Sequence, residues 1–152
     1  MFYSGQNVIF NRTLFHASPV SRLSVIEPRT TNSYKDLGKV VFGSSVPQFS
    51  ACFGSSWSQE YVQIGVMHKD NTDYPNEKRI DKIVFKILDD SKVNLKSPCS
   101  MYEIKGVFRY LEYLGGLEMI SFQKCQVVKE FKFSTFEEML NYYNVQIVKW
   151  YK

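Results

Sequence analysis

The sequence has little cysteine and little histidine, which excludes several kinds of site. Of its 152 residues, three are cysteine and two are histidine. Cys52, Cys99 and Cys125 are odd in number and widely spaced, so they fit neither a disulfide framework nor a redox pair or zinc knuckle. We interpret them as free thiols. His16 and His68, among dispersed carboxylates, lack the close spacing of a zinc or iron site, so we predict no metal.

Long apolar runs are also missing. No uninterrupted run approaches the roughly 20 residues that a membrane-spanning helix needs, so we expect no contact with a membrane. Residues 1–10 mix polar with apolar side chains, unlike the charged start and apolar middle of a secretory signal. We therefore expect a cytoplasmic protein. The glycine-containing stretches 54–58 and 115–116 lack the lysine that follows a phosphate-binding loop, so we expect no nucleoside triphosphate site.

The composition that is present suits one folded domain. The chain is 44% hydrophobic and 16% aromatic, and its length is common for a single core. Its net charge of +4 comes from lysines and arginines that are interleaved with acidic residues. Dispersed charge of this kind is only a weak indication of nucleic acid or an acidic protein as partner.

Short apolar and β-branched runs predict strands along most of the chain. The predicted strands cover residues 12–16, 39–42, 61–67, 82–88, 101–107, 119–122, 126–133 and 145–150. The polar stretch 20–36 indicates a surface loop. Ser134 and Glu137 have the spacing of a capping box and predict a helix over 134–144, while Pro47 suits the first turn of a short helix. Without βαβ alternation, this order predicts an α+β fold in a single domain, residues 1–152.

Three short segments carry candidate site residues. Leu14–Ser18 places His16 at a strand end before the small Ala17, which would let a ligand approach the main chain. Residues 40–53 carry Phe42, Ser50 and Phe53, and two aromatic rings with a hydroxyl between them can hold a flat amide-bearing ring. Each pattern alone also fits an ordinary core residue or a polar strand end.

Glu118 opens the predicted strand 119–122, directly after the flexible pair Gly115–Gly116. A carboxylate there could stabilise the positive charge that develops on a sugar when its glycosidic bond breaks. A solvated surface glutamate is the simpler alternative for this residue.

Taken in this order, the three segments resemble the catalytic core of the ADP-ribosyltransferase superfamily, in its poly-ADP-ribose polymerase-like branch. The resemblance covers roughly residues 12–133. It implies a split, mixed or antiparallel β-sheet core with a few short helices. Ala17 stands where that branch has glycine, and Phe42 and Phe53 stand where it has tyrosine, so that ring stacking is kept while the phenol hydrogen bonds are lost.

The resemblance implies NAD as substrate and His16 and Glu118 as catalytic residues. In it, His16 bonds a ribose hydroxyl, Ser50 bonds the nicotinamide amide, and Glu118 stabilises the ribosyl cation. The residues that it assigns to NAD binding are His16, Ala17, Ser18, Phe42, Ser50 and Phe53. The implied activity is mono-ADP-ribosyl transfer to a macromolecular acceptor, protein or nucleic acid, and the small size also suits a toxin-like role.

Three alternatives remain open at this stage. The chain could be a catalytically degenerate module on the same fold that only binds a ligand or a partner. It could be a small basic nucleic-acid-associated protein, since basic and aromatic residues interleave over 105–113. Cys52 could be a nucleophile partnered by His16.

Overall fold

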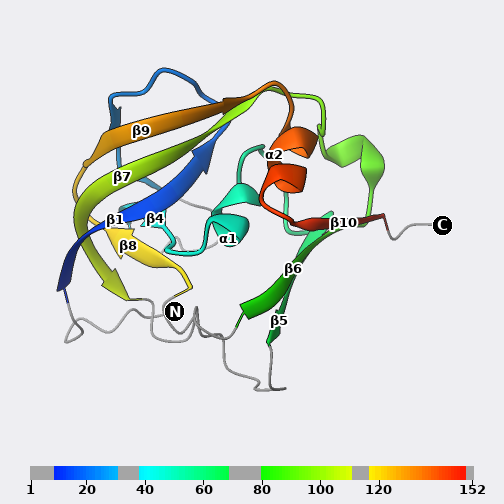
Figure 1. The fold of residues 1–152 in the computed structure, drawn as a ribbon, viewed down its shortest axis with the longest axis horizontal. Helices are drawn as coiled ribbons and strands as arrows, with labels where there is room; N and C mark the ends of the chain where they lie inside the picture. Colours follow the sequence, from blue (N-terminus) through cyan, green and yellow to red (C-terminus); the bar gives the residue numbers. More distant parts are fainter. Residues whose placement is uncertain (1–8, 31–37, 69–79, 111–116, 150–152) are drawn as a thin grey trace.

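A computed structural model describes residues 9–30, 38–68, 80–110 and 117–149, which form two β-sheets and two α-helices (Figure 1). The strands are β1 (Ile9–Ser18), β2 (Val25–Ile26), β3 (Arg29–Thr30), β4 (Lys39–Gly43), β5 (Val62–His68), β6 (Ile80–Ile87), β7 (Cys99–Tyr110), β8 (Met119–Ser121), β9 (Cys125–Phe133) and β10 (Gln146–Lys149). The helices are α1 (Pro47–Ala51), α2 (Phe136–Tyr142) and the 3-10 helix η3 (Asp90–Lys92).

The larger sheet is curled and antiparallel. Its strands follow the order β2-β9-β7-β8-β4-β3, and β1 pairs with β7 along its whole length. On its other edge, β1 meets the end of β4, where the backbones of Phe15 and Ser44 exchange two hydrogen bonds of 2.8 and 3.0 Å. Because β1 touches both β7 and the end of β4, the sheet bends back on itself, as Figure 1 shows.

The inside of this curl is apolar because residues alternate between the two faces of each strand. Leu14 of β1, Phe108 of β7 and Met119 of β8 are fully buried there. Gly43 permits the close approach of β4 to β1, since a Cβ atom at that position would lie 3.1 Å from the side chain of Leu14. The buried packing holds the ends of β1 and β4 side by side.

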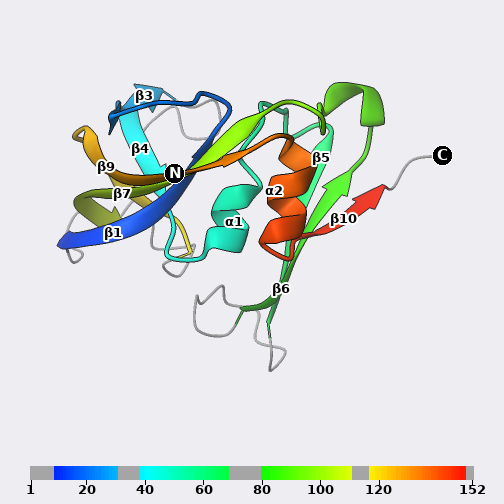
Figure 2. The same ribbon diagram turned by 45° about the horizontal axis from the view of Figure 1, so that its top comes forward.

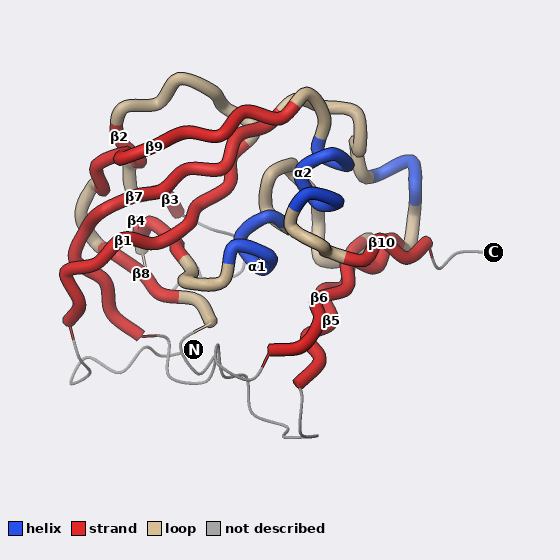
Figure 3. Tube along the Cα trace, in the orientation of Figure 1, coloured by secondary structure: helices blue, strands red, loops and turns tan. Residues whose placement is uncertain are grey.

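The smaller sheet has the order β10-β6-β5, with β5 antiparallel and β10 parallel to β6. Helices α1 and α2 lie between the two sheets (Figure 2), and the strands flank them on both sides in Figure 3. Phe85 of β6 fills the centre of this second core and packs edge-on against Phe136 of α2 and against Trp57. The chain is thus a single compact domain of antiparallel and mixed sheets with few helices.

Most of the predicted elements are confirmed, and the differences are confined to short segments. Residues 20–36 are not only loop: Val25–Ile26 and Arg29–Thr30 pair with β9 and β4, a tertiary pairing that no local pattern shows. The cap of α2 is Thr135, whose hydroxyl accepts from the N–H of Glu138, rather than Ser134 with Glu137.

Other predictions concern segments that the structure describes only in part. Residues 105–110, part of the stretch in which basic and aromatic residues interleave, continue strand β7. Residues 111–116 and Trp150 lie outside the described residues, as do Lys69–Arg79. Phe53 follows α1 rather than lying on it, because the helix ends at Ala51.

Candidate functional site

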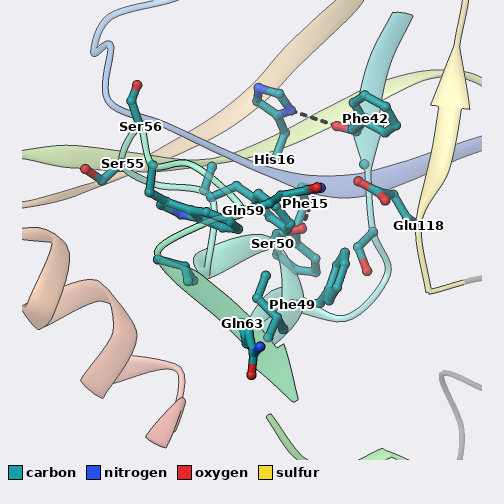
Figure 4. A pocket seen from close by; sticks show the side chains of 17 residues that line it. Phe15, His16, Phe42, Phe49, Ser50, Ser55, Ser56, Gln59, Gln63 and Glu118 are labelled. Atoms are coloured by element: carbon teal, nitrogen blue, oxygen red, sulfur yellow. Dashed lines mark hydrogen bonds between the residues drawn. The ribbon is translucent and has the colours of Figure 1, made fainter. Parts of the chain in front are cut away.

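A pocket of about 880 Å³ lies where β1 and β4 end, beside α1 and the first residues of β5 (Figure 4). Its volume is within the range of small-molecule sites. Six of the residues singled out in the sequence line it together: His16, Ala17, Phe42, Ser50, Phe53 and Glu118. The fold therefore brings three distant segments of the chain to one place.

The pocket forms because β1 and β4 separate after a single backbone pair. If the pairing of Phe15 with Ser44 continued, Ala17 would face Phe42. The carbonyl oxygen of Phe42 instead lies 2.7 Å from Nδ1 of His16. A side-chain hydrogen bond thus takes the place of the next backbone pair, and β1 and β4 diverge around the pocket.

This hydrogen bond also fixes the chemistry of the His16 ring. A carbonyl oxygen only accepts, so Nδ1 carries the proton and Nε2 of the neutral ring is left as an acceptor. Burial lowers the pKa of His16, the bond to Phe42 opposes this, and the charge of Arg29 lowers it further. His16 is therefore a neutral imidazole that can accept a hydrogen bond through Nε2.

Ala17 directs backbone groups into the pocket. Backbone groups of alternate residues in a strand point to the same edge, so the N–H and C=O of Ala17 point to the edge where Phe15 bonds Ser44. In the described residues the backbone pairing between β1 and the end of β4 is the single bridge of Phe15 with Ser44, and it does not extend to Ala17. The main chain of Ala17 therefore offers the pocket one donor and one acceptor.

Ser50 and Ser18 have different surroundings. The hydroxyl of Ser50 donates to the carbonyl oxygen of Phe15 (2.8 Å), which ties α1 to β1 and leaves the oxygen of Ser50 able to accept. The hydroxyl of Ser18 accepts from the N–H of Val20 (3.1 Å) and stabilises the turn after β1. Ser18 is not among the residues that line the pocket.

Aromatic rings form one wall of the pocket. Phe53 is 38% exposed, stacks on Trp57 with ring centres 5.5 Å apart, and meets Phe49 edge-on. The indole N–H of Trp57 donates to the carbonyl oxygen of Cys52 (2.7 Å), which fixes the indole in place. Trp57 was not predicted as a site residue; its only signal in the sequence is an aromatic residue four positions after Phe53.

Glu118 is the most unusual polar residue of the pocket. Its side chain is buried, and Figure 4 shows its carboxyl group pointing into the pocket near Phe42. Within the described part of the chain, no hydrogen bond or ion pair to this carboxyl is found. Burial raises its pKa to about 8, so at neutral pH the carboxyl is mostly protonated. A buried acid with a raised pKa in a pocket is typical of functional sites.

Several polar residues of the pocket were likewise not predicted from the sequence. Ser55, Ser56 and Gln59, from the segment between α1 and β5, line it together with Gln63 of β5. Figure 4 shows Ser55 and Ser56 on the side of the pocket away from Glu118. Only the folding of this segment back over α1 brings these side chains to the pocket.

Cys52 lies outside the pocket lining and is fully buried. Burial raises the pKa of its thiol to about 12, so it is not a thiolate near neutral pH and does not suit a nucleophile. Cys99 and Cys125 are likewise buried free thiols.

Comparisons with protein-family models, curated proteins and solved structures find no match to this chain. The described residues contain no group of three or more histidines, cysteines or carboxylates that could hold a metal ion. No helix in that same part of the chain is long and apolar enough to cross a membrane.

Proposed function

We propose that the pocket binds NAD and that the protein transfers ADP-ribose from NAD to a macromolecular acceptor. One observation carries this proposal: His16, Phe53 and Glu118, from three distant segments, line one pocket together with Ala17, Phe42 and Ser50. Two sheets with a cleft beside the ends of β1 and β4 also suit an ADP-ribosyltransferase-like fold. The relationship to that superfamily is part of the proposal.

The nicotinamide would lie against the aromatic wall. Phe53, held by Trp57, offers a ring for offset stacking, and Phe42 also lines the pocket. The carboxamide has one acceptor and two donors, which match the N–H and C=O of Ala17 and the oxygen of Ser50. No phenol hydroxyl is needed for these contacts.

The adjoining ribose would lie between His16 and Glu118. Nε2 of His16 can accept a hydrogen bond from a ribose hydroxyl, because Nδ1 is committed to Phe42. Glu118 can accept a second one when it is ionised. Holding the sugar at two points orients its anomeric carbon, and orientation contributes to the rate.

The positive charge of the substrate would lower the pKa of Glu118, which burial raises. The nicotinamide ring of NAD is cationic, and a nearby positive charge favours the ionised carboxylate. As the glycosidic bond breaks, positive charge moves onto the ribose, where the carboxylate stabilises it. We expect NAD binding to release a proton from Glu118, and the buried setting to strengthen this attraction.

A ligand-binding module without turnover is the second candidate. It is favoured by the protonated state of Glu118 at neutral pH and by Phe42 and Phe53 in place of tyrosines. In this case NAD or a related nucleotide would bind and leave unchanged. Both candidates use the same pocket, so turnover separates them.

The experiment is to measure NAD binding and nicotinamide release by the purified protein and by Glu118→Gln. We expect binding by both and release by the unmodified protein, with release lower by on the order of a hundredfold in the variant. Glu60→Gln, an exposed carboxylate outside the pocket lining, is the matched control and should retain release. Binding without release favours the module, and absence of binding disproves the proposed site.

A further inference from the structure

Strand β5 borders the pocket and is an edge strand. The smaller sheet ends at β5, and among the described residues no strand pairs with its side opposite β6. An open edge carries a row of backbone N–H and C=O groups that can pair with another extended chain. Its position beside the pocket raises the question of what it binds.

Hydrogen bonds show which residues of β5 present these groups. The N–H of Leu88 donates to the carbonyl oxygen of Tyr61 (2.8 Å), and the register places these two residues opposite one another. By alternation, Gln63, Gly65 and Met67 also bond toward β6. Val62, Ile64 and Val66 therefore direct their N–H and C=O groups to the open edge.

The pocket meets this edge directly. Val62, Gln63 and Ile64 are consecutive and alternate between the two faces of the sheet, yet all three line the pocket. A cavity that contacts both faces of a strand must reach it along its edge. The same cavity is lined on another side by Glu118, so a chain lying along β5 would pass beside the proposed reaction centre.

We infer that an extended segment of an acceptor protein, bearing acidic side chains, adds to the edge of β5 as a further strand. This inference rests on the proposed transfer activity and names its acceptor as a protein. Strand addition uses backbone groups for affinity and side-chain positions for selectivity. It would place a side chain of the segment at the mouth of the pocket.

Positive charge beside the edge of β5 favours a segment with acidic side chains. Lys82 and Lys86 of β6 lie opposite Met67 and Gln63, on the face of the sheet that these β5 residues share. Gly65 of β5 lies between Gln63 and Met67, and a Cβ atom there would have only Val84 within 4 Å, at 3.7 Å. This gap leaves room for the long side chain of Lys82 to reach over β5 toward a carboxylate of an added strand.

The test measures binding of a fluorescent twelve-residue peptide of alternating threonine and glutamate to the full chain by anisotropy. Val66→Pro removes an outward N–H that β6 does not use, and proline is tolerated at such edge positions. Val66→Ala also removes the isopropyl group of valine but keeps the backbone N–H, so it is the matched control. We expect binding to weaken on the order of tenfold in Val66→Pro relative to Val66→Ala.

A second variant and a second peptide test the charge. Lys82→Glu should weaken binding of the threonine-glutamate peptide, and a threonine-lysine peptide should bind the unmodified protein poorly. Equal binding by Val66→Pro and Val66→Ala, or equal binding of both peptides, overturns the inference. Tighter binding of a twelve-nucleotide oligouridylate that is insensitive to Val66→Pro also overturns it.

Two measurements separate this inference from other outcomes. Light scattering detects pairing of two copies through β5: a dimer that Val66→Pro converts to a monomer would make a second copy the occupant and reject the acceptor segment. Nicotinamide release into water requires no acceptor and should be unchanged in Val66→Pro, since Val66 is outside the pocket lining. Loss of peptide binding and loss of NAD chemistry are thus distinguished.

Discussion

Nδ1 of His16 lies 2.7 Å from the backbone carbonyl oxygen of Phe42, at the point where β1 and β4 separate. This contact closes the gap between two diverging strands and sets the tautomer of the imidazole. It therefore links the shape of the pocket to the hydrogen-bonding character of His16, and substitutions at this position test both.

His16→Phe keeps a planar ring and removes both nitrogens. We expect NAD affinity to fall about two- to tenfold, because a hydrogen bond of about 0.5–1.5 kcal/mol is lost. The free energy of unfolding should fall by about 1–3 kcal/mol, since the Phe42 carbonyl loses its partner. Calorimetric titration and denaturant unfolding measure the two effects, and reduced stability with unchanged affinity would leave His16 a structural role only.

The pH dependence of nicotinamide release should report Glu118. The ionised carboxylate is the active form, and its pKa in the protein is raised to about 8 by burial. We expect kcat/KM to rise with pH and to level off above about pH 8. Initial rates across the pH range measure this profile, and a profile already flat from pH 6 would show that Glu118 ionisation does not limit the reaction.

The same group should make stability depend on pH in the opposite sense to a carboxyl group whose pKa is lowered by folding. Its pKa rises from 4.5 to about 8 on folding, so between these values the folded protein binds the extra proton. The contribution of Glu118 to the free energy of unfolding should therefore decrease as pH rises through this window, by at most about 1.4 kcal/mol per pH unit. Urea unfolding of both proteins measures this contribution: the free energy of unfolding of the unmodified protein minus that of Glu118→Gln should become steadily more negative from about pH 4.5 to pH 8, and a difference independent of pH would contradict the assignment.

Phe53→Leu should weaken NAD binding by about two- to tenfold, because a stacked aromatic pair is worth about 0.5–1.5 kcal/mol beyond its buried area. Phe53→Tyr should bind at least as well as the unmodified protein, since it keeps the ring. Quenching of tryptophan fluorescence on titration with NAD measures both, because Trp57 stacks on Phe53. Phe122→Leu, at a similarly exposed phenylalanine outside the pocket lining, is the control, and an equal effect there would argue against stacking.

Gly106→Ala tests the packing of the curled sheet. A Cβ atom at Gly106 would lie 2.7 Å from Sγ of Cys125, so we expect destabilisation of about 1–3 kcal/mol from overpacking. Cys125→Ala removes that sulfur, and the double variant should be more stable than the sum of the single effects predicts. Denaturant unfolding of the four proteins measures the coupling, and strict additivity would mean that β7 and β9 do not approach so closely.

The strands could be predicted from the sequence because their signal is local. Val62, Ile64 and Val66 alternate with polar residues and glycine and form one face of β5, as their spacing indicates. The two-residue strand Val25–Ile26 could not be predicted, because only its pairing with β9 defines it. The cap of α2 was predicted one residue too early, since Ser134 and Thr135 are both capable caps and packing decides between them.

The residues of the site likewise divide into those that could be predicted from the sequence and those that could not. His16, Phe42 and Glu118 could be singled out by their order and their neighbours in the chain. Trp57 could not, because it reaches Phe53 only when the segment after α1 folds back. The burial of Glu118 is likewise invisible in a sequence where it stands beside two glycines.

The sequence by itself determined the single domain, the succession of short strands, the helix positions and the identity of the chemical groups, because these depend on composition and on neighbours a few residues apart. The tertiary structure alone decided that β1 and β4 diverge at His16, that Glu118 is buried, and that the edge of β5 opens onto the same pocket. These features depend on which distant segments pack together, and burial and strand pairing then set the protonation and the exposed backbone groups.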